Sequence, residues 1–106
     1  FVPDTVATIK EEKQLFSITL SNRPNPFNPS TTISFTIPER GPANLSIYSI
    51  TGQKVRTLVS GPMSAGEHSV VWDGRDDGGK AVSSGVYVCR LEVDKRAESK
   101  RMLLIK

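Results

Sequence analysis

Apolar residues that recur at every second position are the feature that most constrains the fold of this chain. In residues 31–37, Ile33, Phe35 and Ile37 alternate with serine and threonine, and segments 67–73 and 86–93 repeat the pattern. Such alternation places one face of a strand on a core and the other face in water. No apolar pattern at the 3.6-residue spacing of a helix persists for ten residues, so the sequence predicts strands.

Clusters of glycine, proline and aspartate separate these segments, at 38–42, 51–52, 60–66, 73–79 and 83–85. Further strands are expected at 16–20, 43–50, 54–59 and 97–105. The alternation in 43–50 changes phase at Tyr48, which indicates a bulge or a strand end. Short strands divided by such turns are typical of a sandwich. We expect an all-β fold, an immunoglobulin-like antiparallel β-sandwich of about seven strands in residues 14–106, with residues 1–13 as a linker or N-terminal tail.

A proline-rich segment comes directly before the clearest strand. Proline fixes its own φ and pushes the residue before it into extended geometry, so we expect a stiff corner. Asparagine before proline is expected to close local turns onto the backbone. Phe27 is the only large apolar residue in the segment, and we expect it to plug one end of the core rather than to form part of a protruding polyproline ligand. The corner comprises Pro24, Asn25, Pro26, Phe27, Asn28 and Pro29.

The charge distribution argues against nucleic acid. The formal net charge is only +3, and no aromatic side chain interleaves with the basic cluster of residues 95–106 to provide a stacking platform. That cluster is typical of a solvated edge strand protected by charge. No apolar run approaches the roughly 20 residues that span a bilayer. The single cysteine, Cys89, has no partner for an internal disulfide and is expected to be buried.

An Asp-Gly segment follows Trp72, and we interpret it as a hairpin turn. The hairpin residues are Trp72, Asp73, Gly74, Asp76, Asp77 and Gly78. A helix–loop–helix calcium site starting at Asp73 fails, because Arg75 and Ser84 stand where oxygen ligands are needed. Asp76 and Asp77 remain open as ligands for a cation at the rim of the sandwich.

The only histidine, His68, shares a face with Val70 and Trp72, which favours a packed or rim position with a backbone partner. No nucleophile elbow accompanies it. We therefore expect a non-catalytic domain without a metal or cofactor. Trp72 belongs to the same alternating face and is expected to be packed, although an exposed tryptophan there would make a carbohydrate-binding domain conceivable.

Several blocks, taken in order, carry a family resemblance: NRPNPFNPSTTISFTIP, LSIYSITGQKVRTLV, GEHSVVWDGRDDGGKAVSSGVYVCRL and KRMLLIK. From about residue 16 to residue 106 the chain resembles the C-terminal sorting domains of proteins exported by the bacterial type IX secretion system. It is also similar to the immunoglobulin-like domain of the flagellar hook-cap protein. The resemblance implies a module of a larger secreted bacterial protein, located at the cell surface and covalently continuous with an upstream cargo domain.

The same resemblance implies that the secretion and attachment machinery recognises the last strand, either by strand addition or through its basic side chains. The residues that correspond are Lys100, Arg101, Met102, Leu103, Leu104, Ile105 and Lys106. Two alternatives stay open: a hook-cap-like structural assembly domain, and an accessory sugar-binding domain of a secreted hydrolase.

Overall fold

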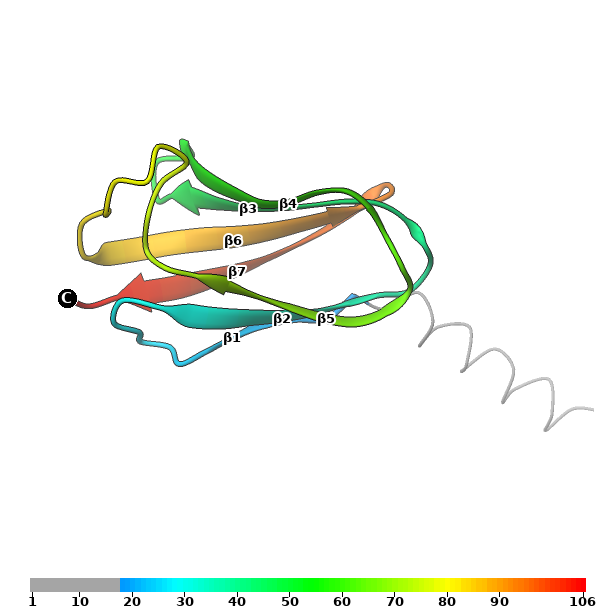
Figure 1. Ribbon diagram of the computed structural model, residues 1–106, viewed down its shortest axis with the longest axis horizontal. Helices are drawn as coiled ribbons and strands as arrows, with labels where there is room; N and C mark the ends of the chain where they lie inside the picture. Colours follow the sequence, from blue (N-terminus) through cyan, green and yellow to red (C-terminus); the bar gives the residue numbers. More distant parts are fainter. Residues whose placement is uncertain (1–17) are drawn as a thin grey trace, which may run out of the picture.

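The computed structural model describes residues 18–106, which form two antiparallel sheets facing each other (Figure 1). One sheet has the strand order β1-β2-β5 and the other has the order β4-β3-β6-β7. The strands are β1 (Leu20–Arg23), β2 (Thr31–Ile37), β3 (Gly41–Ser49), β4 (Lys54–Met63), β5 (Gly66–Trp72), β6 (Gly85–Val93) and β7 (Arg96–Leu104). The all-β sandwich predicted from the sequence is confirmed. The expected tail at 1–13, and residues 14–17 with it, lie outside the described residues.

The core lies between the two sheets and follows the alternation in the sequence. Ile33, Phe35 and Ile37 of β2 are buried, whereas the residues between them face outward. Burying one such side chain stabilises the fold by about 1.5–3 kcal/mol relative to leaving it exposed. The facing sheet contributes Ala43, Leu45, Ile47, Tyr87, Cys89, Leu91, Val93, Met102 and Leu104. Within residues 18–106, no helix has the length and hydropathy needed to cross a membrane.

Tyr87 secures the start of β6. Its hydroxyl donates a 2.6 Å hydrogen bond to the carbonyl oxygen of Ser83, and its ring packs edge-on against Trp72 at a centroid separation of 5.4 Å. A tyrosine that bonds back to the backbone just upstream, as here, is a recurrent feature of immunoglobulin-like sandwiches. The loop entering β6 is therefore held to the body of the sandwich.

The structure corrects two strand boundaries. The first described strand, β1, runs from Leu20 to Arg23, whereas the sequence predicted a strand at 16–20. β4 continues to Met63, whereas the sequence predicted a break from residue 60. Pro62 is tolerated because β4 is an edge strand of its sheet, where one side of the backbone has no ladder partner. The predicted irregularity near Tyr48 is confirmed, because the β3–β4 register shifts between Ile47 and Tyr48.

The Asp-Gly segment forms a tight turn, but this turn does not join its flanking strands β5 and β6 as neighbours in one sheet. β5 pairs with β2, and β6 pairs with β3 and β7, so the segment crosses from one sheet to the other. An isolated antiparallel bridge between Arg75 and Ala81 closes the turn locally. Turn residues specify a reversal of the chain, but they do not specify which sheet the next strand joins. We call residues 73–84 the crossover loop.

Candidate functional site

Phe27 and Trp72 close one end of the core, as the sequence predicted for Phe27. Phe27 is 2% exposed and Trp72 is fully buried, and their ring centroids are 5.6 Å apart with the planes tilted. The indole Nε1–H of Trp72 donates a 2.9 Å hydrogen bond to the carbonyl oxygen of Arg75. Because Trp72 is buried, it offers no face to a sugar, and the carbohydrate-binding alternative loses its platform.

The proline corner also covers the edge of β7, the last strand of the four-stranded sheet. The Phe27 N–H donates to the Leu103 carbonyl oxygen at 2.9 Å, and the Ile105 N–H donates to the Phe27 carbonyl oxygen at 2.9 Å. The Leu103 N–H donates to Oδ1 of Asn25 at 3.0 Å. In Figure 1 the loop before β2 lies at the same end of the sandwich as the C-terminus. The edge of β7 is therefore occupied from Leu103 to Ile105.

The role expected for asparagine in this corner is corrected at Asn25. Its side chain does not close a local turn but bonds to β7, with a longer 3.4 Å contact from Nδ2 to the Arg101 carbonyl oxygen in addition to the bond from Leu103. An asparagine side chain carries a donor and an acceptor like a peptide group, so it can complete a strand edge. The peptide bonds preceding Pro24, Pro26 and Pro29 are cis.

A buried polar pair beside the corner was not predicted from the sequence. Thr31 and Asn22 are both buried. The Thr31 hydroxyl donates to the Pro24 carbonyl oxygen at 2.9 Å, and Nδ2 of Asn22 donates to Oγ1 of Thr31 at 3.2 Å. These bonds fasten the corner to the end of β1 and to the start of β2. The signal in the sequence was a pair of polar residues on the inward-facing positions of two paired strands.

The crossover loop covers the opposite edge of the same sheet. The Asp77 N–H donates to the Val55 carbonyl oxygen at 3.0 Å, and Oδ1 of Asp77 accepts from the Thr57 N–H at 3.0 Å. Oδ1 of Asp76 accepts from the backbone N–H groups of Gly78 and Lys80. Both carboxylates are thus engaged with backbone donors. Across residues 18–106, no cluster of three His, Cys, Asp or Glu side chains is placed to hold a metal ion.

The two motifs meet at Gly74. This glycine has φ +76°, and a Cβ built on it would lie 2.9 Å from the carbonyl oxygen of Pro29. The close approach leaves no room for a side chain between the crossover loop and the proline corner. The corner and the hairpin residues named from the sequence therefore form one packed structure at a single end of the sandwich.

The predicted recognition residues of β7 divide into two groups. Met102 and Leu104 point into the core. Arg101, Leu103, Ile105 and Lys106 are exposed, and Lys100 is half-buried. Period-two geometry places Lys100, Met102 and Leu104 on one face of β7. Arg101 and Leu103 on the other face, and Ile105 and Lys106 beyond the strand, are available to a partner.

The remaining single residues behave as the sequence predicted. His68 lies at the rim, with Nε2 2.8 Å from the Ser64 carbonyl oxygen and its ring stacked on Phe35. Cys89 is buried, and burial raises the pKa of its thiol to about 12, although the nearby Lys100 acts in the opposite direction.

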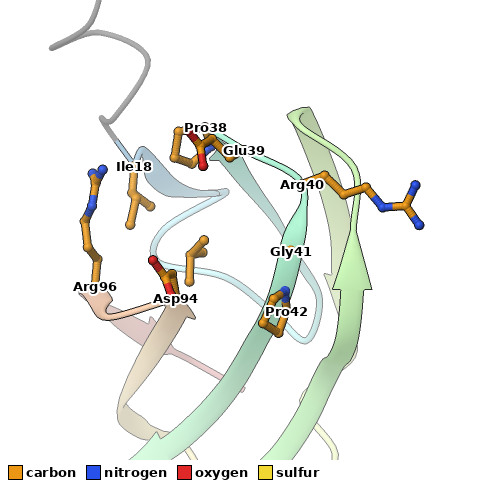
Figure 2. Close-up of a pocket in the computed structure, with 9 residues that line it drawn as sticks. Ile18, Pro38, Glu39, Arg40, Gly41, Pro42, Asp94 and Arg96 are labelled. Atoms are coloured by element: carbon orange, nitrogen blue, oxygen red, sulfur yellow. The ribbon is translucent and has the colours of Figure 1, made fainter.

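A hollow of about 280 Å³ lies at the other end of the sandwich, between the β2–β3 turn and the β6–β7 turn (Figure 2). Ile18, Glu39, Asp94 and Arg96 line it, whereas the Arg40 side chain extends away from the others in Figure 2. The hollow follows the end of β2, whereas the proline corner precedes the start of β2. It therefore belongs to a different part of the molecule from the packed motifs.

Several solved structures share this fold. PorZ, described as an essential surface component of the type IX secretion system of Porphyromonas gingivalis, is 26% identical over 82% of this chain, with a TM-score of 0.57. Dimeric latent PorU from the same organism is 19% identical over 83% of the chain, with a TM-score of 0.64. FlgD from Xanthomonas campestris, described in connection with hook capping, is 23% identical over 90% of the chain, with a TM-score of 0.56.

The extent of these matches differs among the relatives. The chain spans 11% of PorZ and 9% of PorU, but 72% of the Xanthomonas FlgD chain. No curated protein matches the sequence significantly. The model of the FlgD Ig-like domain matches residues 21–96, which include β1 to β6 and the start of β7, together with the proline corner and the crossover loop. The chain therefore belongs to the FlgD Ig-like domain family.

Proposed function

We propose that this domain is a non-catalytic sorting and anchoring module of a larger secreted bacterial protein, recognised by type IX secretion and attachment machinery. The observation that carries the proposal is the similarity to PorZ, a surface component of that system, over 82% of this chain. Because the matched region is a small part of PorZ and of PorU, a domain of this kind occurs as one module within much longer proteins. An extracytoplasmic location and a covalently linked upstream cargo are parts of the same proposal.

The geometry of β7 supports recognition through side chains. Strand addition along residues 103–105 would have to displace the backbone of Phe27 and the amide of Asn25. The exposed side chains of Arg101, Leu103 and Ile105 are accessible without any such displacement. A partner is therefore expected to read the surface of the folded domain rather than its backbone edge.

A reporter fusion tests this proposal. The full chain is fused to the C-terminus of a periplasm-targeted fluorescent protein in Porphyromonas gingivalis, and fluorescence at the cell surface is measured. We expect display that requires the domain and falls in the Leu103→Ser/Ile105→Ser double variant. Val71→Ser, on the exposed face of the other sheet, is the matched control. Removing Met102–Lys106 is less informative, because it deletes two core side chains. Equal display with and without the domain would contradict the proposal.

A second candidate is a hook-cap-like structural domain that assembles with copies of itself or with a filament. The family match and the large share of the Xanthomonas FlgD chain that is covered favour it. This candidate predicts self-association of the isolated chain, whereas the sorting module requires none. Sedimentation velocity over a range of concentrations separates the two: a mass that rises with concentration supports assembly, and a constant monomer mass counts against it.

A further inference from the structure

Three exposed apolar residues form a row across the outer face of the four-stranded sheet. Val86 of β6 pairs directly with Leu103 of β7. Ile50 follows β3 one residue beyond the Ser49–Tyr87 pair, so the antiparallel register brings it toward Val86. Ile50 is 63% exposed, Val86 38% and Leu103 37%. Contiguous apolar surface on a small domain marks an interaction site more often than scattered exposed residues do.

The next pair of residues along β3 and β6 adds a hollow to this surface. Tyr48 of β3 pairs with Val88 of β6, and both residues, together with Ile50, line an open hollow of about 530 Å³. Its wall combines this ring and these aliphatic side chains with the polar residues Ser49, Arg90, Glu92 and Ser99. The part formed by Tyr48, Ile50 and Val88 accepts a projecting apolar side chain. It does not itself project, as a loop that inserts into a lipid surface must.

Two cations flank the Tyr48–Val88 pair. Lys54 of β4 pairs with Tyr48, and Arg101 of β7 pairs with Val88. Both are exposed, and neither is joined to an acidic side chain by an ion pair within residues 18–106. On the same face, Arg90 and Glu92 form an ion pair at 3.7 Å and largely offset each other. The row of paired residues through Tyr48 and Val88 therefore carries two positive charges at its ends, which favours a partner that carries carboxylates.

We propose that the row of Ile50, Val86 and Leu103, with the cations Lys54 and Arg101, docks a protein segment that projects a large apolar side chain flanked by carboxylates. The inference rests on the proposed function, because this segment belongs to the machinery that recognises the domain. A second copy of the chain is disfavoured, because a two-fold contact through this face places the same cations on both sides. A bilayer is disfavoured, because Val86 and Leu103 of the apolar row lie on the face of a sheet beside a hollow.

Nuclear magnetic resonance with the full ¹⁵N-labelled chain provides the test. The probe is a short synthetic peptide with central leucine and phenylalanine and flanking aspartates, and the control peptide carries lysines in place of the aspartates. We expect the acidic peptide to shift the amide resonances of residues 48–50, 86–88 and 101–103, and the basic peptide to leave them unchanged. Val86→Asp and Arg101→Glu should each weaken binding about tenfold or more. Val71→Asp, at a position that is exposed on the other sheet, should leave binding unchanged.

Four results would overturn the inference. The first is the absence of shifts on this face when the acidic peptide is added. The second concerns Val86→Thr, which preserves the shape and β-branching of valine: the inference is overturned if Val86→Asp and Arg101→Glu bind the peptide as tightly as Val86→Thr does. The third is binding to phosphatidylglycerol vesicles that Val86→Asp abolishes, which assigns the face to lipid. The fourth is a dimer in sedimentation that Val86→Asp dissociates, which assigns it to a second copy. If Val86→Asp leaves surface display intact while removal of the domain abolishes it, the docking face is wrong and the proposed function stands.

Discussion

The Phe27 N–H donates a hydrogen bond to the Leu103 carbonyl oxygen at 2.9 Å, and the ring of the same phenylalanine fills the end of the core. One residue thus closes both the hydrophobic interior and the open edge of β7. The crossover loop covers the edge of β4 through Asp77. An exposed sheet edge is a template for unwanted pairing, so these two caps protect the four-stranded sheet from edge-to-edge association at this end.

Truncating the corner's ring should be among the most damaging single changes. Phe27→Ala is expected to lower the free energy of unfolding by about 3–5 kcal/mol, because it removes a buried aromatic side chain and leaves a cavity beside Trp72. Phe27→Leu should have a smaller effect because it fills part of the space. Urea denaturation followed by Trp72 fluorescence measures both. A loss below about 1 kcal/mol for the alanine variant is the size expected of a surface position and would refute the plug.

Removing the amide of Asn25 should open the edge of β7 locally. Asn25→Ala is expected to cost about 1 kcal/mol and to accelerate hydrogen exchange of the Leu103 amide, which loses its acceptor. Asn28→Ala, an exposed position on the same corner, is the matched control. Native-state hydrogen exchange of the full chain resolves the individual amides. Unchanged protection of Leu103 in the Asn25 variant would show that the side chain does not cap the strand.

The contact between the two motifs is tested by a pair of glycines. Both Gly74 and Gly79 have positive φ, but only at Gly74 would a Cβ approach a backbone oxygen to 2.9 Å, whereas Gly79 has open space. Gly79→Ala should show only the left-handed strain of roughly 1–2 kcal/mol. Gly74→Ala should lower the free energy of unfolding by more than this, because the Pro29 oxygen that it meets belongs to the backbone and cannot move aside without shifting the corner. Equal losses in thermal denaturation would mean that the motifs are not in tight contact.

Burial of Cys89 predicts a pH-dependent contribution to stability. The folded-state pKa is raised to about 12 from 9.0, so the unfolded chain releases the thiol proton first as pH rises. The contribution of the buried thiol to the free energy of unfolding is therefore fully present below pH 9. It declines between pH 9 and 12, by at most about 1.4 kcal/mol per pH unit. The stability advantage of the native chain over Cys89→Ala should narrow over that range. A difference that stays constant from pH 8 to 11 would contradict the burial of the thiol. At pH 8 the native thiol should also resist disulfide reagents until the chain unfolds.

The sandwich was predictable because its signals are local. Alternation in β2, β5 and β6 predicts which face of each strand is buried, and Phe27 is the only large apolar residue in the corner. The destination of the crossover loop was not predictable, because turn chemistry at Asp76 to Gly79 is the same whether the next strand joins one sheet or the other. The bonds from Asn25 and Asp77 to strand edges were missed for a related reason: they join segments distant in sequence, and only the folded pairing brings them together.

The candidate docking face shows the same limit. Leu103 was identified through the resemblance of the last strand, but Ile50 and Val86 looked like ordinary strand-end residues in the sequence. Their alignment depends on the registers of β3 with β6 and of β6 with β7, which no local pattern specifies.

The proposal that type IX secretion machinery recognises this domain is tested by surface display in strains with and without an intact type IX system. The full chain, fused behind a periplasm-targeted fluorescent protein, is expressed in Porphyromonas gingivalis and in a derivative lacking PorZ, and the fluorescence accessible to external protease is quantified. We expect surface-exposed reporter in the first strain and reporter retained inside the second. Equal exposure in both strains would contradict recognition by that system.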